Sequence, residues 1–204
     1  MTPYSKYEIY TTVQSIYCYK GSSVLKNRFH IREQELLLHV ERELVSAKQM
    51  MLLQTPLKGR YTKTHLLRIH KFLFGDLYSF AGHYRREQIS KGDTVFYPPN
   101  MIPRALDSLF HEIENTKLLF ETDFQKQIQH LSYVMAELNA IHPFREGNGR
   151  CIREFIRCIS LHYGFSLQWS LIDPETLIQA SIASIYDSSA FMPHLTRCAV
   201  SPVY

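Results

Sequence analysis

Apolar residues recur at intervals of three and four along most of this chain, which is the spacing of one face of an α-helix. Only the stretch 86–98 departs from it, because β-forming residues such as Ile89 and Phe96 lie on both sides of a Lys91-Gly92-Asp93 turn. We therefore expect an all-α fold with one small β-hairpin. The predicted helices run over 32–54, from Thr62 or Thr64 to Gly75, over 103–119 and 124–141, and directly after the loop that follows residue 141.

The composition is that of one globular protein. With 204 residues, 45% of them hydrophobic and 21% charged, the chain is long enough for one full core, so we expect a single domain over 1–204. The net charge of +4 is spread without a basic run, which does not indicate a nucleic-acid surface.

The four cysteines show no CxxC pair and no regular spacing, which argues against a disulfide framework and a zinc site. A reducing cytoplasm is the expected location. The N-terminal residues lack the basic head and apolar run of a cleaved signal, and no segment reaches bilayer-spanning length. We therefore expect neither secretion by a cleaved signal nor membrane insertion.

The segment Ile141-His142-Pro143-Phe144-Arg145-Glu146-Gly147-Asn148-Gly149-Arg150-Cys151-Ile152-Arg153 concentrates reactive side chains in one loop. The apolar stripe of the helix before it ends at Ile141, so His142 is expected in the last turn of a rigid element. Gly147 and Gly149 permit a sharp turn with exposed amides, and such a turn can form an anion nest.

A second apolar stripe follows the loop, and Arg150, Arg153 and Arg157 share another face of that helix. Nest amides, a helix N-terminus and arginine side chains would then converge on a phosphate. A base, a carboxylate and an anion cradle are the parts needed to move a phosphate-bearing group.

Each of these features also has an ordinary structural explanation. A histidine at a helix end usually caps it, a Gly-Asn-Gly turn between helices is usually structural, and three arginines on one face are more often solvated or salt-bridged. Their joint occurrence in one loop between two buried helices favours a functional site.

The residues from His142 to Arg153 resemble the Fic motif, HPFx(D/E)GNGRxxR, at every defining position. Segments 19–27, 69–74 and 78–85 are similar to other parts of Fic proteins, and Trp169 with 179–186 resembles the tail of short bacterial Fic toxins. The resemblance implies an all-α Fic/Fido helical domain with a β-hairpin flap. Its core would span about 58–198, after an N-terminal helical extension over 1–57.

The resemblance implies transfer of AMP from ATP to a serine, threonine or tyrosine hydroxyl of a target protein. It makes His142 the general base and Glu146 the ligand of Mg²⁺. Arg150 would assist at the β-phosphate and Arg153 at the γ-phosphate. The phosphate- and ATP-binding residues that it implies are Arg145, Gly147, Asn148, Gly149, Arg150 and Arg153, with Tyr186 lining the nucleoside pocket.

The hairpin would align an extended segment of the target by strand addition and so bring its hydroxyl to His142. The flap residues assigned to target docking and nucleotide contact are Ile89, Asp93, Thr94, Val95 and Phe96.

Many Fic proteins carry an inhibitory helix of pattern (S/T)xxxE(G/N). The best match here, Ser108 to Glu112, has Ile113 at the sixth position and lies in a predicted helix inside the domain, so it is interpreted as a chance match. We therefore expect a separate small antitoxin protein to supply the inhibitory helix. By analogy with that branch of the family, the targets would be the ATPase subunits of DNA gyrase and topoisomerase IV.

Two other interpretations remain open. Fic domains can also transfer UMP, phosphate or phosphocholine, and the motif alone does not fix which group is presented to the hydroxyl. The chain could instead be a binding module that keeps the fold without turnover. The intact pair of His142 and Glu146 weighs against a module, because a scaffold has no use for both.

Overall fold

The computed structural model describes residues 8–9 and 14–201 of the chain. Within them it contains seven α-helices, which confirms the predicted all-α class. These are α1 (Gln34–Gln54), α2 (Lys63–Phe74), α3 (Ile102–Asn115), α4 (Phe124–Ile141), α5 (Asn148–His162), α6 (Pro174–Ala183) and α7 (Met192–Cys198). Short 3-10 turns lie at Pro99–Met101, Leu118–Phe120 and Trp169–Leu171.

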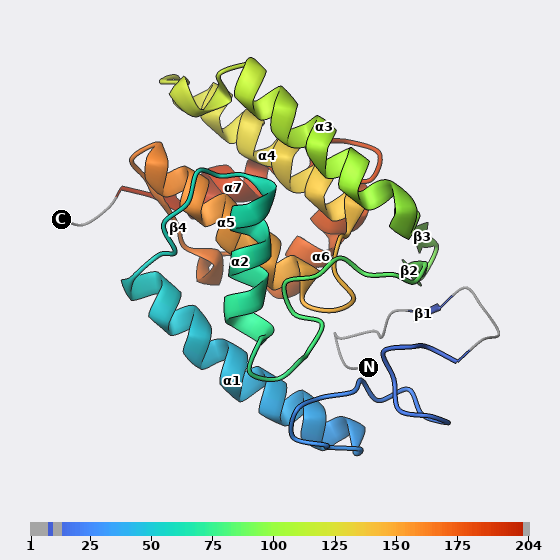
Figure 1. Cartoon of the computed structure of the whole chain (residues 1–204). Helices are drawn as coiled ribbons and strands as arrows, with labels where there is room; N and C mark the ends of the chain where they lie inside the picture. The colour runs from blue at the N-terminus through green and yellow to red at the C-terminus, as the bar shows by residue number, and fades with distance from the viewer. Residues whose placement is uncertain (1–7, 10–13, 202–204) are drawn as a thin grey trace.

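Helix α5 forms the centre of the fold. It packs between α2 and α4, while α3 and α7 pack on α4 and α1 packs on α2 (Figure 1). Most residues of α5 are buried, since apolar side chains such as Ile152, Phe155 and Ile156 occupy more than one of its faces. The loop 142–147 joins α4 to α5 and is therefore held by two well-packed helices.

The helix boundaries follow local signals closely. Helix α4 has the predicted bounds, because Asp123 caps it by accepting the amide of Lys126 at 2.9 Å. Helix α3 ends at Asn115, before the predicted residue 119, because Lys117 adopts a left-handed conformation with φ 54° that no α-helix continues.

The predicted hairpin is confirmed, and it carries an additional strand. Strands β2 (Ile89–Lys91) and β3 (Thr94–Val95) pair antiparallel around Gly92. Strand β1 (Glu8–Ile9) pairs antiparallel with the other edge of β2, so that β2 is the middle strand. A second small sheet joins β4 (Ser166–Leu167) to β5 (Ala199–Val200).

Helix α1 shares the main hydrophobic core through Leu37, Val45 and Leu52. Its fourth buried position is a carboxylate, Glu41, which lies among these apolar residues on the inner face. The four cysteines are free thiols and all are buried. No helix in the described part of the chain combines the length and the hydropathy that a membrane span requires.

Candidate active site

A cavity of about 880 Å³ lies over the loop between α4 and α5. Its walls come from residues 14–25, the inner face of α1, the β2–β3 turn, the motif and α6 with the residues just after it. Such a volume lies in the range of ligand pockets for small molecules.

The loop depends on two left-handed residues. His142 ends α4 with φ 48°, and Gly147 begins α5 with φ 80°. A Cβ on Gly147 would lie 2.2 Å from the ring of Phe74, so neither the conformation nor the space admits a side chain. His142 was predicted in the last helical turn, but it lies just beyond that turn, where the chain reverses.

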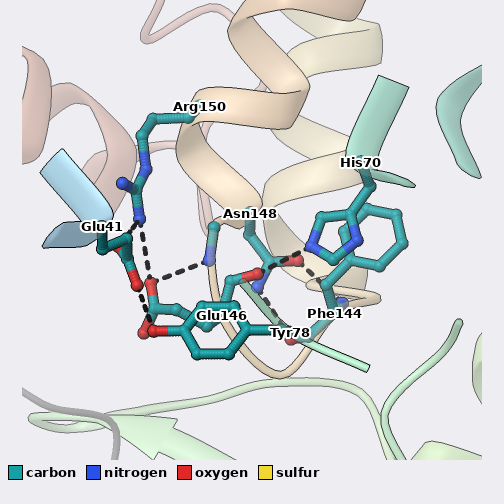
Figure 2. A network of polar contacts seen from close by, with 8 residues as sticks. Glu41, His70, Tyr78, Phe144, Glu146, Asn148 and Arg150 are labelled. Carbon is teal, nitrogen blue, oxygen red and sulfur yellow. Dashed lines mark hydrogen bonds and ion pairs between the residues drawn. The ribbon is translucent and has the colours of Figure 1, made fainter. Parts of the chain in front are cut away.

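The side chain of Asn148 closes the loop on itself. Its Oδ1 accepts the amide of Phe144 at 2.9 Å, and its Nδ2 donates to the carbonyl of Phe144 at 2.8 Å (Figure 2). The prediction gave Asn148 a direct phosphate contact, whereas its buried amide group fixes the shape of the loop. An anion at the start of α5 would therefore meet the backbone of Asn148 and not its side chain.

His142 is buried and held from two sides. Its Nδ1 donates to the carbonyl of Asn139 at 3.0 Å, and the ring of Phe96 stacks on it with centroids 3.7 Å apart. Since a carbonyl only accepts, Nδ1 carries the proton and Nε2 is the nitrogen that accepts one. Burial lowers the pKa of His142 to about 3, so the ring is neutral at physiological pH.

Arg85 ties the end of α4 to the residues that follow the hairpin. Its Nε donates to the carbonyl of His142 at 2.8 Å, and its Nη2 donates to the carbonyl of Tyr97 at 2.5 Å. The backbone amide of Arg85 also donates to the carbonyl of Pro143 at 2.9 Å. A fully buried guanidinium thus satisfies carbonyls at the C-terminus of α4 and fixes the backbone of the histidine.

His70 supports the motif from α2. Its Nε2 donates to the carbonyl of Glu146 at 2.9 Å, and its ring stacks on Phe144 with centroids 3.7 Å apart (Figure 2). Its Nδ1 accepts the amide of Gly82 at 2.8 Å. Burial lowers the pKa of His70 to about 3, which keeps it neutral. A neutral imidazole suits one donated and one accepted hydrogen bond.

Glu146 belongs to a network of charged groups. Arg150 Nη2 lies 2.5 Å from Glu41 Oε1 and 3.5 Å from Glu146 Oε1, and Tyr78 donates its hydroxyl to Glu41 (Figure 2). The amide of Gly147 donates to Glu146 Oε1 at 2.8 Å. Burial first, and then the negative charge of Glu41, raise the pKa of Glu146.

The predicted arginines separate into two groups. Arg145, Arg150 and Arg153 line the cavity, and Arg153 Nη1 would lie 3.3 Å from a Cβ on Gly149. Arg157 was grouped with them by its helical spacing, but it pairs with Glu154 at 2.7 Å and donates to the carbonyl of Leu52 at 2.8 Å. It is a buried structural residue, because the helix turns it away from the cavity into the contact with α1.

The flap residues also divide. Thr94 and Phe96 line the cavity, and so do Lys91 and Gly92. Ile89 is fully buried beneath the sheet and Val95 points to solvent, with 53% of its surface exposed. The cavity lining does not include Ile89, Asp93 or Val95.

Tyr186, which was predicted to line a nucleoside pocket, is not among the residues that line the cavity. Its side chain is 90% exposed, whereas the neighbouring Ile185 does line the cavity.

Glu41, His70, Tyr78 and Arg85 are among the site residues that carried no predicted role. Glu41 and His70 leave a signal in the sequence, since each is a titratable residue in a helix whose neighbouring apolar positions are buried. Arg85 leaves no such signal, because it lies in a loop beside the exposed Arg86. Buried charges and imidazoles of this kind are paired or functional, so an acidic residue inside an apolar stripe is the sign to look for.

Known proteins resemble this chain in both sequence and structure. Residues 60–160 match the Fic/DOC family. The chain is 34% identical over 176 residues to protein adenylyltransferase VbhT of Bartonella schoenbuchensis, covering 86% of this chain and 37% of that protein. It is 32% identical over 176 residues to the probable protein adenylyltransferase y4lH of Sinorhizobium fredii, covering 86% and 90%.

A third sequence relative, the probable protein adenylyltransferase Fic of Escherichia coli K12, is 30% identical over 165 residues, covering 81% of this chain and 82% of that protein. Among solved structures, BepC of Bartonella tribocorum, determined with bound AMPPNP, has the same fold. It is 23% identical, with a TM-score of 0.82 over 92% of this chain and 97% of that one. The motif, the fold and these relatives together establish that the chain belongs to the Fic/DOC family.

Proposed function

We propose that this protein is a protein adenylyltransferase, which transfers AMP from ATP to a hydroxyl side chain of a target protein. The observation that carries the proposal is the position of a buried, neutral His142 in the same cavity as the glycine loop and Arg153. Relatives that are named as protein adenylyltransferases, at 30% to 34% identity, support the same activity. The chain spans 37% of the length of VbhT, so the proposal concerns the activity of the shared part alone.

In the proposed reaction, the target hydroxyl attacks the α-phosphorus of ATP. His142 Nε2 takes the hydroxyl proton, a new oxygen–phosphorus bond forms to AMP, and the bond to the pyrophosphate leaving group breaks. Asn139 keeps the proton on Nδ1, and Phe96 fixes the plane of the ring. Positioning of this kind supplies much of the rate gain in such transfers.

The phosphates would lie at the N-terminus of α5, where backbone amides and the helix dipole favour an anion. We assign Arg153 to the γ-phosphate, and its guanidinium beside Gly149 at the start of α5 supports this assignment. Arg145 adds positive charge in the same cavity.

Mg²⁺ belongs to the same proposal, with Glu146 as its protein ligand. The residue fits, because its carboxylate lies in the cavity wall and Mg²⁺ is usually held by one or two carboxylates together with substrate phosphates. When bound, the ion would neutralise charge on the phosphates.

The hairpin is the proposed docking site for an extended segment of the target, by strand addition. Because β1 pairs with one edge of β2 and β3 with the other, a segment that adds to β2 has to replace β1. Phe96, which lines the cavity and stacks on His142, would connect the hairpin to the proposed base.

Inhibition by a small antitoxin protein, a toxin role, and DNA gyrase or topoisomerase IV as targets remain proposals by family analogy. The match at 108–112 lies in α3, where Glu112 accepts the hydroxyl of Tyr133 at 2.7 Å, which supports its interpretation as a chance match. A cytoplasmic location and the division of the domain near residue 57 also stay proposals.

The test is incubation of the protein with a cell lysate and ATP labelled either in the base or in the γ-phosphate. Base label on a protein band that requires Mg²⁺ and is lost in His142→Ala supports AMP transfer. Label from the γ-phosphate would indicate phosphate transfer and not AMP transfer. A parallel incubation with labelled UTP tests UMP transfer, which label from UTP alone would indicate. If no protein band is labelled with any of these nucleotides, phosphocholine transfer or a binding module is favoured.

A further inference from the structure

Glu41 is a buried acidic residue with both carboxylate oxygens engaged. Oε1 accepts from Arg150 at 2.5 Å and Oε2 accepts the hydroxyl of Tyr78, while 7% of the side chain is exposed. The other buried positions of α1 are apolar. Removing a carboxylate from water is costly even when it is paired, and α1 could have carried another apolar residue at this position.

Arg150 lies between two acidic residues, and its distances to them are unequal. The same nitrogen, Nη2, lies 2.5 Å from Glu41 and 3.5 Å from Glu146. The Phe74 ring, 4.8 Å from the guanidinium carbon, supports it from another side. Attraction between charges falls with distance, so the guanidinium belongs mainly to Glu41.

We propose that Glu41 is a positioning residue that holds Arg150 away from Glu146 and so leaves the Glu146 carboxylate available to a divalent cation. The inference rests on the proposed function, in which Glu146 is the protein ligand of that cation. Without the charge of Glu41, Arg150 still has the Glu146 carboxylate within reach, since its Nη2 already lies 3.5 Å from Glu146 Oε1. A guanidinium bound there competes with the cation for the same oxygen.

Tyr78 completes the arrangement. Its hydroxyl donates to the second oxygen of Glu41, so the carboxylate, which lies in the cavity wall, is held through both of its oxygens. Tyr78 is itself fully buried, and burial raises the pKa of its hydroxyl, which keeps it a donor. The three side chains come from α1, α5 and the segment after α2, so the packing of these elements sets the geometry (Figure 2).

The experiment measures, by calorimetry, how much saturating Mn²⁺ tightens the binding of AMPPNP compared with binding in EDTA. In Glu41→Gln this gain is expected to shrink by roughly 10- to 100-fold, the usual effect of losing a group that orients a metal ligand. Binding of AMPPNP in EDTA should not weaken. The double variant Glu41→Gln with Arg150→Met should recover the gain, because the competing guanidinium is gone.

Glu154→Gln is the matched control. Glu154 also pairs with an arginine in a buried site, Arg157 at 2.7 Å, but does not line the cavity. It should leave the Mn²⁺ gain unchanged. If Glu41→Gln does not fold, Tyr78→Phe decides alone, and it should reduce the gain less than tenfold but in the same direction.

The outcomes separate the two proposals. If Mn²⁺ tightens AMPPNP binding equally in the unaltered protein and in Glu41→Gln, the role of Glu41 is overturned, but the metal role of Glu146 is not. Tighter AMPPNP binding in EDTA by Glu41→Gln, with the Mn²⁺ gain kept, would make Glu41 a restraint on phosphate binding and also overturn it. No gain in the unaltered protein, or a gain that survives in Glu146→Gln, overturns the metal role of Glu146 and the inference with it.

Discussion

The ring of Phe96 lies almost parallel to the imidazole of His142, with centroids 3.7 Å apart and planes inclined by 17°. Phe96 follows the hairpin and His142 ends α4, so this contact joins the proposed target-docking site to the proposed base. A flat contact of this kind fixes the tilt of the ring while the hydrogen bond to Asn139 fixes its rotation.

Replacing Phe96 with leucine keeps an apolar side chain but removes the flat contact. We expect kcat for AMP transfer to fall by roughly 10- to 100-fold, because small errors in the position of a catalytic group cost that much. AMPPNP affinity should change little. Phe165→Leu is the control, since Phe165 is similarly buried, with 8% exposed against 6% for Phe96, and makes aromatic contacts outside the cavity. Equal losses in both variants would mean that the effect is general destabilisation.

Gly147→Ala and Gly164→Ala both introduce backbone strain at a left-handed residue, but only the first also brings a Cβ into contact with a ring. Both glycines have positive φ, 80° and 93°, but only Gly147 has a ring 2.2 Å from an added Cβ, whereas Gly164 has nothing within 4 Å. Each variant should lose about 1–2 kcal/mol of unfolding free energy from the left-handed conformation. Gly147→Ala should lose about 1–3 kcal/mol more by overpacking. Urea unfolding measures both, and equal losses would contradict the contact with Phe74.

Arg153→Gln and Arg157→Gln should affect different properties, nucleotide affinity and stability, although the two residues lie one helical turn apart. Arg153 lines the cavity, so its loss should weaken binding of ATP more than binding of AMP. Arg157 is buried against Glu154, so its loss should leave both affinities unchanged and cost about 3–5 kcal/mol of stability. Calorimetry and urea unfolding separate the two. Equal weakening of ATP and AMP in Arg153→Gln would reject a γ-phosphate contact.

This pair also shows what the sequence could predict. Spacing placed Arg150, Arg153 and Arg157 on one face, and α5 indeed begins and continues as expected. Spacing along one helix does not say which neighbour covers each turn. Because α1 packs near the later turns, Arg157 meets Glu154 and the Leu52 carbonyl instead of the cavity.

Features set by adjacent residues were predicted well, and features that join distant segments were not. The bounds of α4 follow from the Asp123 cap and the break at Pro143, and the hairpin follows from β-forming residues around Gly92. The pair of Glu41 and Arg150 spans 109 positions in the chain, and the pairing of β1 with β2 spans about 80. Neither leaves a local pattern, apart from a lone acidic residue in an apolar stripe.

The pairing of β1 with β2 gives a prediction for target binding. Ile9 lies opposite Ile89, on the edge of β2 that a target segment would need. Ile9→Pro removes a backbone donor and should release that edge, which lowers KM for the target protein. Ile9→Val keeps the backbone and is the control. ATP affinity should not change in either variant. An unchanged KM in Ile9→Pro would mean that targets do not add to this edge.

The protonation of His142 gives a prediction for pH. Burial is the largest cause that lowers its pKa from 6.5 to about 3. The charges of Arg85 and Lys91 also lower the pKa, whereas the hydrogen bond to Asn139 raises it. Between these values the unfolded chain binds a proton that the folded protein does not, so the contribution of His142 to stability is present above pH 6.5 and is lost as the pH falls. The slope is about 1.4 kcal/mol per pH unit.

In His142→Asn no group titrates at this position. As the pH falls below 6.5, the unfolding free energy of the variant should therefore decrease less steeply than that of the unaltered protein, and the two slopes should differ by about 1.4 kcal/mol per pH unit. Urea unfolding at a series of pH values below 6.5 gives the difference. The imidazole resonance that disappears in His142→Asn should also show no titration at 6.5 in NMR spectra of the folded protein. A resonance that titrates there would mean that solvent reaches the ring, and a base exposed in that way would be protonated over part of the physiological range.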